Sequence, residues 1–570
     1  MKDYNYEYKN WLQYKNLDKE MLEELELIKD KTEEIEERFY KDLEFGTGGL
    51  RGLIGAGTNR MNIYTIRKLT LALANYIISQ GAEAMQRGVA IAYDSRKFSK
   101  EFAEETAKVL ATNKIKVYLF NDIRPLPLLS FTIRYLKTFS GVVITASHNP
   151  STYNGYKVYN MHGSQITESI AEQLHNEINK ITNMLDIPVI GFEKAIKDKM
   201  IIMIGEEIDS EYIKNVKNLL LNKDYINEFG NNLKVVYTPL HGTGNMLVKR
   251  VLKEINFNNL YTVKEQEDPH PDFPTVSAPN PEDTEVFNLA IKLAEEKEVD
   301  IIMGTDPDAD RLGVLVNVNG RYQALNGNQL GVIVLNYLLS ERKAQGTLTK
   351  DYIVIKTIVT SELGRKIADK YEIKTEDTLT GFKYIGEKIN NYELEGEKNF
   401  LFGYEESFGY LAGDFVRDKD AVQIAALIVE MAIFYKQKGH TLFDILENIY
   451  KQYGYFAEEL VSISLEGING SKKIAELLDI YRKCPPNDVN CIKVKRVEDY
   501  LDGNTSKVDL PKSNVIKLIL EDDSWIALRP SGTEPKIKIY FSVVADSYIE
   551  VSKKLSSLKS TIINSLNLSE

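Results

Sequence analysis

Apolar runs and amphipathic segments alternate along most of the chain. Charged residues with apolar positions at helical spacing predict an amphipathic helix over residues 18–45. Residues 88–96 (GVAIAYDSR) are typical of a buried strand, residues 99–113 of a helix capped by Ser99, and residues 114–120 of a second strand. Because this order is typical of a βαβ unit, we expect a parallel or mixed sheet.

The same rhythm recurs in two later blocks. Each block again predicts strands, helices and polar loops that follow the strands. The second block has a strand and glycine-rich turn at 234–245, a helix at 248–255, and a strand with its loop at 299–311. The third has residues 352–361, 375–389 and 399–410. No simple residue-level repeat accompanies this rhythm.

The C-terminal part has a different pattern. An apolar helix at 420–437 and a second helix at 439–454 precede a predicted strand at 515–530. That strand meets residues 531–545 across a turn, and a helix is expected at 548–564. Paired strands followed by a helix indicate an α+β domain. The sequence thus predicts three similar mixed-sheet α/β domains and a C-terminal α+β domain, with the ranges 1–205, 206–320, 321–445 and 446–570.

Composition narrows the class of protein. A length of 570 residues fits several domains. The net charge of −12 argues against a nucleic-acid partner. Cys484 and Cys491 lack CxxC spacing, so we expect free thiols in a reducing compartment. The N-terminus has no apolar signal-peptide core and no apolar run reaches about 18 residues, so we expect a cytoplasmic protein without a membrane partner.

The loop DPDAD carries the strongest sign of chemistry. Asp306, Asp308 and Asp310 alternate after an apolar strand, which brings several carboxylate oxygens toward one point and suits a hard cation such as Mg²⁺. The loop fails the EF-hand pattern, because Arg311 takes the place of glycine and Asn317 that of glutamate. The alternative is a solvated acidic turn, which explains poorly why Arg311 follows directly.

Two further loops are candidates for ligand binding. The turn RPSGTEPK offers Arg529, two hydroxyls, backbone N–H groups around Gly532, and Lys536, which together suit a phosphate dianion. An ordinary hairpin is the alternative. In GYEESFGY, Glu405 and Glu406 fit an acid–base pair, metal ligands or acceptors for sugar hydroxyls, and an exposed acidic turn fits as well.

Ser147 lies in TASHNPSTYNGYK (145–157), after an apolar strand. A serine in such a place is usually a cap or turn residue. His148 beside it does not indicate a hydrolase, because the chain has no GxSxG elbow. Glycines around Arg51 allow a close approach to a ligand, but no Walker A pattern occurs. A serine, a carboxylate metal site and an anion cradle together indicate phosphoryl transfer.

The order TASHNP…NGYK, DPDADR, GYEES and RPSGTEPK resembles the α-D-phosphohexomutases, in particular their longer phosphoglucomutase and phosphopentomutase branch. The likeness runs from FGTGGLRG to RPSGTEPK and so spans nearly the whole chain. It implies four domains around a central cleft, with one loop of each domain meeting there. Tyr404 and Phe408 depart from the shorter members, which have Gly and Gly–His, and this puts the identity of the sugar in doubt.

The resemblance also implies roles for the residues. Ser147 would carry the phosphoryl group and would bind Mg²⁺ together with Asp306, Asp308 and Asp310. Lys157 would be the general base near the reacting hydroxyl, beside Arg51, with His148 as a positioning residue or an alternative base. The implied substrate contacts are Arg311 near the phosphoserine, Lys383 for substrate orientation, Glu405 and Ser407 for sugar hydroxyls, and Arg529, Ser531, Gly532, Thr533 and Lys536 for the phosphate.

The implied reaction converts glucose 1-phosphate to glucose 6-phosphate through a bound glucose 1,6-bisphosphate. Alternatives with the same chemistry are a phosphopentomutase and a glucose 1,6-bisphosphate synthase. A haloacid-dehalogenase-type enzyme would need Thr or Val where Asp310 stands and would leave Ser147 unexplained. A sugar-phosphate sensor without activity is a further alternative. We expect a small sugar phosphate as the partner and a monomer or weak dimer.

Overall fold

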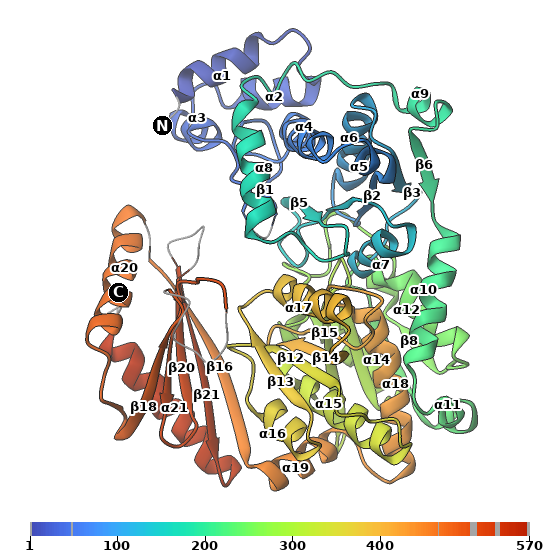
Figure 1. Ribbon diagram of the computed structural model, residues 1–570, viewed down its shortest axis with the longest axis vertical. Helices are drawn as coiled ribbons and strands as arrows, with labels where there is room; N and C mark the ends of the chain where they lie inside the picture. The colour runs from blue at the N-terminus through green and yellow to red at the C-terminus, as the bar shows by residue number, and fades with distance from the viewer. Residues whose placement is uncertain (1–2, 47–48, 466, 502–509, 531–535, 567–570) are drawn as a thin grey trace. The chain divides into compact units, whose positions relative to one another are not determined.

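The first block of the chain builds a mixed six-stranded sheet in the order β1-β5-β4-β2-β3-β6 (Figure 1). β2, β3, β4 and β6 run parallel, and β5 and β1 complete the sheet with antiparallel pairs. The strands are β1 (Leu50–Leu53), β2 (Val89–Tyr93), β3 (Val117–Phe120), β4 (Ser140–Ile144), β5 (Tyr153–Tyr159) and β6 (Ile201–Ile204). The predicted βαβ unit is therefore confirmed. The computed structural model describes residues 3–46, 49–465, 467–501, 510–530 and 536–566.

Helices cover this first sheet because its strands are apolar and buried. α4 packs against both α6 and α8 over a core that includes Ile91, Val142 and Ile144, and α7 contacts β2 and β4. The helices are α1 (Tyr4–Gln13), α2 (Lys19–Leu27), α3 (Thr32–Phe39), α4 (Ile63–Ser79), α5 (Ala82–Arg87), α6 (Ser99–Thr112), α7 (Leu126–Leu136), α8 (Glu168–Lys180) and α9 (Phe192–Lys197).

The second block forms a five-stranded sheet in the order β11-β10-β9-β7-β8. Its strands are β7 (Val235–Thr238), β8 (Leu260–Thr262), β9 (Ile301–Thr305), β10 (Leu312–Val318) and β11 (Arg321–Leu325). Its helices are α10 (Glu206–Leu219), α11 (Lys223–Phe229), α12 (Gly244–Glu254), α13 (Lys264–Glu267) and α14 (Asn288–Lys297), with short 3₁₀ turns η1 (Gly230–Asn232) and η2 (Thr284–Phe287). β7 and β9 are parallel, so their carboxyl ends lie at the same edge.

The third block has a four-stranded sheet in the order β13-β12-β14-β15. Its strands are β12 (Tyr352–Thr357), β13 (Lys374–Thr378), β14 (Asn399–Glu405) and β15 (Gly409–Leu411). Its helices are α15 (Gly327–Ala344), α16 (Leu363–Lys370), α17 (Phe382–Glu395), α18 (Ala421–Gln437) and α19 (Leu442–Tyr453). Asp420 caps α18 by accepting from the amides of Val422 and Gln423.

The C-terminal block is a six-stranded sheet in the order β16-β21-β20-β19-β18-β17, with α20 and α21 packed on it (Figure 1). Each pair of neighbouring strands in this sheet is antiparallel, which fits the predicted α+β class. Its elements are β16 (Tyr455–Ser464), α20 (Gly467–Lys483), β17 (Asp488–Val489), β18 (Ile492–Asp499), β19 (Ile516–Leu520), β20 (Trp525–Pro530), β21 (Lys536–Ala545) and α21 (Tyr548–Ser565).

Tertiary packing divides the chain into two compact units. The first unit comprises residues 1–326, 382–402 and 407–439, and the second comprises residues 327–381, 403–406 and 440–570. Within the described part of the chain, no helix is both long and apolar enough to cross a bilayer. Cys484 and Cys491 are exposed free thiols.

The single helix predicted over residues 18–45 is wrong, because the chain turns between α2 and α3. Leu25 on α2 and Phe39 on α3 belong to one buried cluster with Trp11. In one straight helix those 14 positions would span about 20 Å along the axis. The turn instead lets both helices bury their apolar faces together, and α3 packs against α1.

Two smaller predictions also need correction. Ser99 is the first residue of α6 and not its cap; its hydroxyl donates to Asp94 Oδ1 at 2.6 Å. The strand expected at 515–530 is a hairpin of β19 and β20 joined by the polar residues 521–524, with Asp523 at a φ of +65°. The hairpin lets the apolar residues on both sides of the turn enter the same core.

Candidate active site

Ser147 lies in the loop between β4 and β5, at the carboxyl end of a strand whose residues are all buried. The residue is 2% exposed and has a φ of +53°. Its amide donates to Thr145 Oγ1 at 2.8 Å, which fixes the turn. Its hydroxyl donates to Asp306 Oδ2 at 2.8 Å and lies 3.2 Å from His148 Nδ1. The serine loop and the aspartate loop, 159 residues apart in sequence, thus meet directly.

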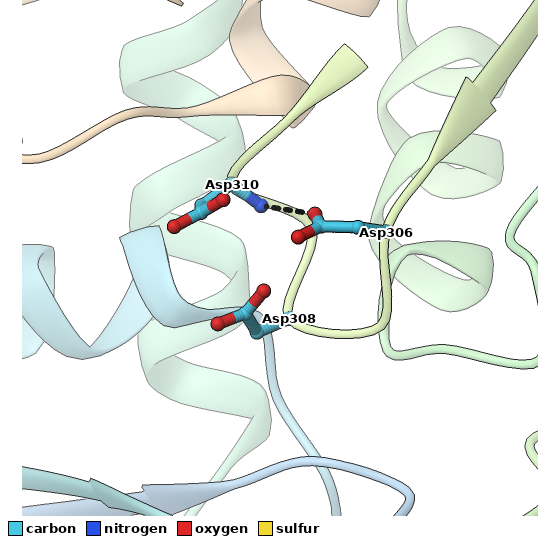
Figure 2. Close-up of side chains that lie close together, drawn as sticks. All are labelled: Asp306, Asp308 and Asp310. Carbon is cyan, nitrogen blue, oxygen red and sulfur yellow. Dashed lines mark hydrogen bonds between the residues drawn. The ribbon is translucent and has the colours of Figure 1, made fainter. Parts of the chain in front are cut away.

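The three aspartates of DPDAD are buried and converge (Figure 2). One oxygen from each of Asp306, Asp308 and Asp310 lies within 4.8 Å of the others. Asp306 Oδ1 accepts from the amides of Asp310 and Arg311 at 3.1 and 3.0 Å, which curls the loop. Asp308 Oδ1 and Asp310 Oδ1 are buried without a hydrogen-bond donor among the described residues. Buried carboxylate oxygens of this kind fit a hard divalent cation.

The charges of this cluster are unequal. Burial and the neighbouring carboxylates of Asp308 and Asp310 raise the pKa of Asp306 well above its usual value. Burial also opposes ionisation of Asp308, but Lys157 Nζ lies 3.0 Å from its Oδ2 and holds the pKa of Asp308 below the usual value. Three carboxylates in so small a buried volume repel one another, and a divalent cation would offset that repulsion.

A glycine turn from the second sheet supports the aspartate loop. The amide and hydroxyl of Thr243 both donate to the Pro307 carbonyl at 2.8 Å. A Cβ on Gly242 would lie only 2.4 Å from Pro307 Cα, so only glycine allows this approach. From the first domain, the amide of Leu126 donates to the Asp308 carbonyl at 2.9 Å. Both domains therefore hold the aspartate loop in place.

Basic side chains surround Ser147 and the aspartates. Arg51 on β1 is paired in register with Gly155 on β5 and donates to Asn149 Oδ1 at 3.1 Å. Arg311 forms an ion pair with Glu282. Burial, and then the charges of Arg311 and Arg51, lower the pKa of His148 well below its usual value, so its ring is neutral near pH 7.

Lys383 and Ser407 also belong to the first compact unit. Lys383, near the start of α17, is 8% exposed and forms an ion pair with Glu168 at 2.8 Å. Ser407 lies in the partly buried turn between β14 and β15. The next residue, Phe408, has a φ of +64° and accepts from the amide of Leu312 at 3.1 Å.

Glu405 is the last residue of β14 and begins the loop of residues 405–408, which we call the Glu405 loop. It accepts from the amide of Gly381 at 2.9 Å. The adjacent Glu406 accepts from the hydroxyls of Thr357 and Thr360 at 3.4 and 3.2 Å. The segment that follows β12 therefore supports the Glu405 loop.

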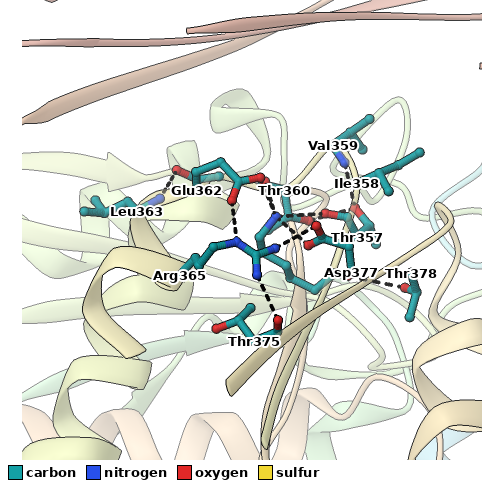
Figure 3. Close-up of polar contacts among 12 residues, drawn as sticks. Thr357, Ile358, Val359, Thr360, Glu362, Leu363, Arg365, Thr375, Asp377 and Thr378 are labelled. Atoms are coloured by element: carbon teal, nitrogen blue, oxygen red, sulfur yellow. Dashed lines mark hydrogen bonds and ion pairs between the residues drawn. The ribbon is translucent and has the colours of Figure 1, made fainter. Parts of the chain in front are cut away.

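A partly buried group of charges lies beside that segment, at the end of β12 (Figure 3). Lys356 is fully buried and lies 3.0 Å from Glu362 Oε1 and 2.9 Å from Asp377 Oδ1. Arg365 pairs with the same two carboxylates at 2.9 and 2.7 Å. Lys517 of β19 donates to the Ile358 carbonyl at 2.7 Å. Charged groups thus fix the position of residues 357–361, which hold Glu406.

The predicted phosphate cradle is described in part. Arg529 is the next-to-last residue of β20 and lies near Tyr540 of β21, and Lys536 begins β21. The two strands pair antiparallel from Trp525 to Pro530, so they flank the loop as expected. Ser531, Gly532 and Thr533 lie outside the described residues.

Two charged side chains near the aspartates and Ser147 were not singled out from the sequence. Lys419 Nζ lies 3.1 Å from Asp310 Oδ2 and 3.2 Å from Asp418 Oδ1. Arg96 donates to the carbonyl of Ser147. A signal for Arg96 existed, because its DSR motif follows the predicted strand β2 at the same sheet edge as the serine loop.

The four sheets and the convergent serine and aspartates agree with the comparison to protein families. The chain matches the phosphoglucomutase/phosphomannomutase models for α/β/α domain I over residues 42–184, domain II over 210–320, domain III over 326–453, and the C-terminal domain over 470–549. The chain belongs to this family, within the α-D-phosphohexomutase superfamily.

Individual relatives make the class more specific. A phosphoglucomutase from Staphylococcus aureus strain MRSA252 is 40% identical over 538 residues, which cover 92% of this chain and 94% of the relative. Among solved structures, a Paramecium phosphoglucomutase aligns with a TM-score of 0.69 at 19% identity, covering 93% of this chain and 96% of the other. A phosphoglucomutase/phosphomannomutase family protein from Burkholderia thailandensis aligns with a TM-score of 0.66 at 16% identity, covering 92% and 98%.

Proposed function

We propose that this protein is a phosphoglucomutase that interconverts glucose 1-phosphate and glucose 6-phosphate through a phosphoserine at Ser147. The observation that carries the proposal is the 2.8 Å hydrogen bond from the Ser147 hydroxyl to Asp306, inside a buried group of three aspartates. The 40% identity to a phosphoglucomutase over most of both chains supports glucose as the sugar. The substrate is then a small sugar phosphate, and a monomer or weak dimer remains our prediction.

The aspartates fit a resident Mg²⁺. The buried oxygens Asp308 Oδ1 and Asp310 Oδ1 have no hydrogen-bond donor among the described residues, and all-oxygen donors suit this ion. We propose that Asp306, Asp308 and Asp310 would hold it, with an oxygen of the phosphorylated Ser147. When bound, the cation would neutralise negative charge on the phosphoryl group and so favour attack by a sugar hydroxyl.

The proposed reaction consists of two phosphoryl transfers, first from Ser147 to the sugar and then from the sugar back to Ser147. The 6-hydroxyl of glucose 1-phosphate forms a bond to phosphorus, the bond between phosphorus and Ser147 Oγ breaks, and glucose 1,6-bisphosphate results. The intermediate turns over within the site, and its 1-phosphoryl group then returns to Ser147, which releases glucose 6-phosphate. Such transfer depends mostly on positioning and on neutralising charge.

Protons need a carrier in both steps. We propose Lys157 as the base for the sugar hydroxyl, with Arg51 beside it, as the resemblance implies. His148 is the alternative, and the structure supports that alternative in one respect: its ring is neutral and lies 3.2 Å from Ser147 Oγ. Lys157 instead donates to Asp308 at 3.0 Å. Comparing kcat of Lys157→Met with that of His148→Gln separates the two assignments.

Substrate contacts follow the same plan. We propose Arg529 and Lys536, with Ser531, Gly532 and Thr533, for the phosphate that is not transferred. Glu405 would accept hydrogen bonds from sugar hydroxyls, and Ser407 would donate hydrogen bonds to them or accept hydrogen bonds from them. Arg311 would lie near the phosphoserine, and Lys383 would set the orientation of the substrate. Arginine suits this task because its planar donors match phosphate oxygens.

The test uses intact-protein mass spectrometry and a coupled assay for glucose 6-phosphate. Incubation with glucose 1,6-bisphosphate and Mg²⁺ should add one phosphoryl group to the wild type and to Ser151→Ala, which removes a hydroxyl from the same loop. Ser147→Ala should gain no phosphoryl group and should lose turnover. Wild-type turnover by Ser147→Ala would overturn the proposal.

A further inference from the structure

Arg96 joins the serine loop through four main-chain carbonyls. Its Nη2 donates to the carbonyls of Ser147 and Asn149, each at 2.5 Å. Its Nη1 donates to those of Pro150 and Tyr153 at 2.8 and 3.1 Å. One guanidinium group therefore contacts the loop from the serine to the first residue of β5. Arginine alone among side chains presents several donors in a rigid planar fork.

The guanidinium group is itself firmly fixed. The Arg96 side chain is fully buried, and its Nε lies 3.3 Å from Asp94 Oδ2, which is equally buried. Asp94 Oδ1 accepts from the Arg96 amide at 3.0 Å and from the Ser99 hydroxyl at 2.6 Å. The ring of Phe273, from the second domain, lies 4.9 Å from the guanidinium carbon. A buried charge held on all sides has little freedom to move.

These contacts bear on the conformation of Ser147. Its φ of +53° lies in the left-handed region, which costs a residue with a side chain about 1–2 kcal/mol. Such a conformation persists when its surroundings fix it. Since the peptide unit is planar and trans, turning the Ser147 carbonyl toward Arg96 turns the His148 amide the opposite way. Among the described residues, none accepts a hydrogen bond from that amide.

We propose that Arg96 is a positioning residue of the phosphoryl-transfer site, which holds the main chain of residues 147–153 so that the Ser147 hydroxyl stays directed at Asp306. This inference rests on the proposed role of Ser147. Arg96 does not touch the transferred group. It acts through the loop, so its loss should slow the chemical step and leave substrate affinity nearly unchanged.

The chain offers a matched control in Arg87. Its side chain likewise donates to two main-chain carbonyls, those of Lys137 and Thr138 at 2.9 and 3.3 Å, and lies over a phenylalanine ring, Phe139, at 5.8 Å. These contacts lie before β4, whereas Ser147 follows that strand. Arg87→Lys therefore removes the same kind of contact from the same domain. The contact lies just before the start of β4, whereas the serine loop lies at its end.

The test compares Arg96→Lys, Arg96→Met and Arg87→Lys in the full-length protein. Lysine keeps the charge but loses the planar fork. We expect kcat to fall about 100-fold in Arg96→Lys and further in Arg96→Met, with KM for glucose 1-phosphate within about twofold of the wild type. Arg87→Lys should keep both constants. A wild-type kcat in Arg96→Lys, or an equal loss in Arg87→Lys, would overturn the proposal.

Hydrogen exchange provides a readout that does not need activity. Amides in peptides covering residues 145–154 should exchange about tenfold faster in Arg96→Lys, whereas in Arg87→Lys the change should be confined to peptides covering 137–141. Unchanged exchange at residues 145–154 in Arg96→Lys would refute the proposal that Arg96 holds this loop. If the wild type shows no mutase turnover, the proposed function fails, and this exchange result still decides whether Arg96 holds the loop.

Discussion

Several residues of the first compact unit adopt left-handed backbone conformations without being glycine, among them one in each of three loops near the aspartates. Ser147, Ala309 and Phe408 have φ angles of +53°, +49° and +64°. Ser147 lies in the serine loop, Ala309 in the aspartate loop and Phe408 in the Glu405 loop. Left-handed conformations cost residues with a Cβ free energy, so they persist where neighbouring contacts fix them. At Ser147 the contacts of Arg96 supply that constraint.

The strain at Ser147 leads to a stability prediction. Ser147→Gly and Ser147→Ala both remove the hydroxyl, but only glycine adopts a positive φ without a steric cost. We expect Ser147→Gly to be about 0.5–1 kcal/mol more stable than Ser147→Ala, after the greater flexibility of glycine in the unfolded chain is subtracted. Thermal midpoints of the two inactive variants measure the difference. A higher midpoint for Ser147→Ala would show that the loop relaxes away from the left-handed conformation.

Arg529 should affect binding more than chemistry. If it holds the phosphate that is not transferred, Arg529→Ala should raise KM for glucose 1-phosphate at least about tenfold, with a smaller effect on kcat. Arg496→Ala is a suitable control, because Arg496 lies on β18 of the same sheet, pairs with Glu498 and is 58% exposed. Initial rates over a range of substrate concentrations measure both constants. A normal KM in Arg529→Ala would exclude the cradle assignment.

At the level of elements, the end of β12 depends on buried charges. Lys356→Met would remove one of the cations that Glu362 and Asp377 share, leaving them to Arg365 and, more distantly, Lys517. We expect a loss of about 2 kcal/mol, because the two partly buried carboxylates lose one of their two close cations and keep Arg365. The urea midpoint of unfolding measures this loss.

Lys350→Met is the control for Lys356→Met. Lys350 pairs with Glu372, and the two side chains are 83% and 67% exposed. An exposed pair of this kind contributes about 0–1 kcal/mol. Equal shifts of the urea midpoint in the two variants would contradict the structural importance of the buried group.

Strand β16 carries a group that titrates near neutral pH. Burial raises the pKa of Glu458 from about 4.5 to about 7, although Ser361 and Ser542 donate to it and act in the opposite direction. Between these two values the folded protein binds more protons than the unfolded chain, so stability falls as pH rises through this window. Because the side chain keeps some exposure, we expect an effect of about 1–2 kcal/mol.

Glu458→Gln should remove this pH dependence. The thermal midpoint of Glu458→Gln minus that of the wild type should be larger at pH 8 than at pH 5. Glu459→Gln is the control, because Glu459 lies next to it on β16 but forms an ion pair with Lys559 at 2.8 Å. The same pH-dependent gain in both variants, or in neither, would exclude Glu458 as the cause.

At the scale of the whole molecule, local patterns predicted much of the fold. The alternation of apolar strands and amphipathic helices predicted the βαβ units and the paired C-terminal strands. These predictions succeed because burial of one face imposes a fixed spacing of apolar residues on strands and on helices. Asp306, Asp308 and Asp310 were predicted as a group because their spacing after a strand brings them together. The turns within 18–45 and at 521–524 were missed because tertiary burial, and not local periodicity, decides them.

Contacts between distant segments were beyond the reach of the pattern. Lys419 lies more than 100 positions after Asp310, and no motif in the sequence indicates that the two side chains meet. Tyr404, which differs from shorter relatives, is fully buried, and a Cβ on Gly331 or Gly364 would lie within 2.3 Å of its ring or hydroxyl. The tyrosine at position 404 therefore fits only because Gly331 and Gly364, on α15 and α16, have no side chain. The spacing of residues along the chain does not reveal this contact.

The most direct test of the central claim is phosphorus NMR of the purified protein with Mg²⁺ and a trace of glucose 1,6-bisphosphate. Glucose, mannose and ribose 1-phosphates are supplied together in one tube. We expect glucose 1-phosphate to be converted first, to glucose 6-phosphate, and Ser147→Ala to convert none of the three. Faster conversion of ribose 1-phosphate would contradict the assignment of glucose, and conversion by Ser147→Ala would contradict the phosphoserine mechanism itself.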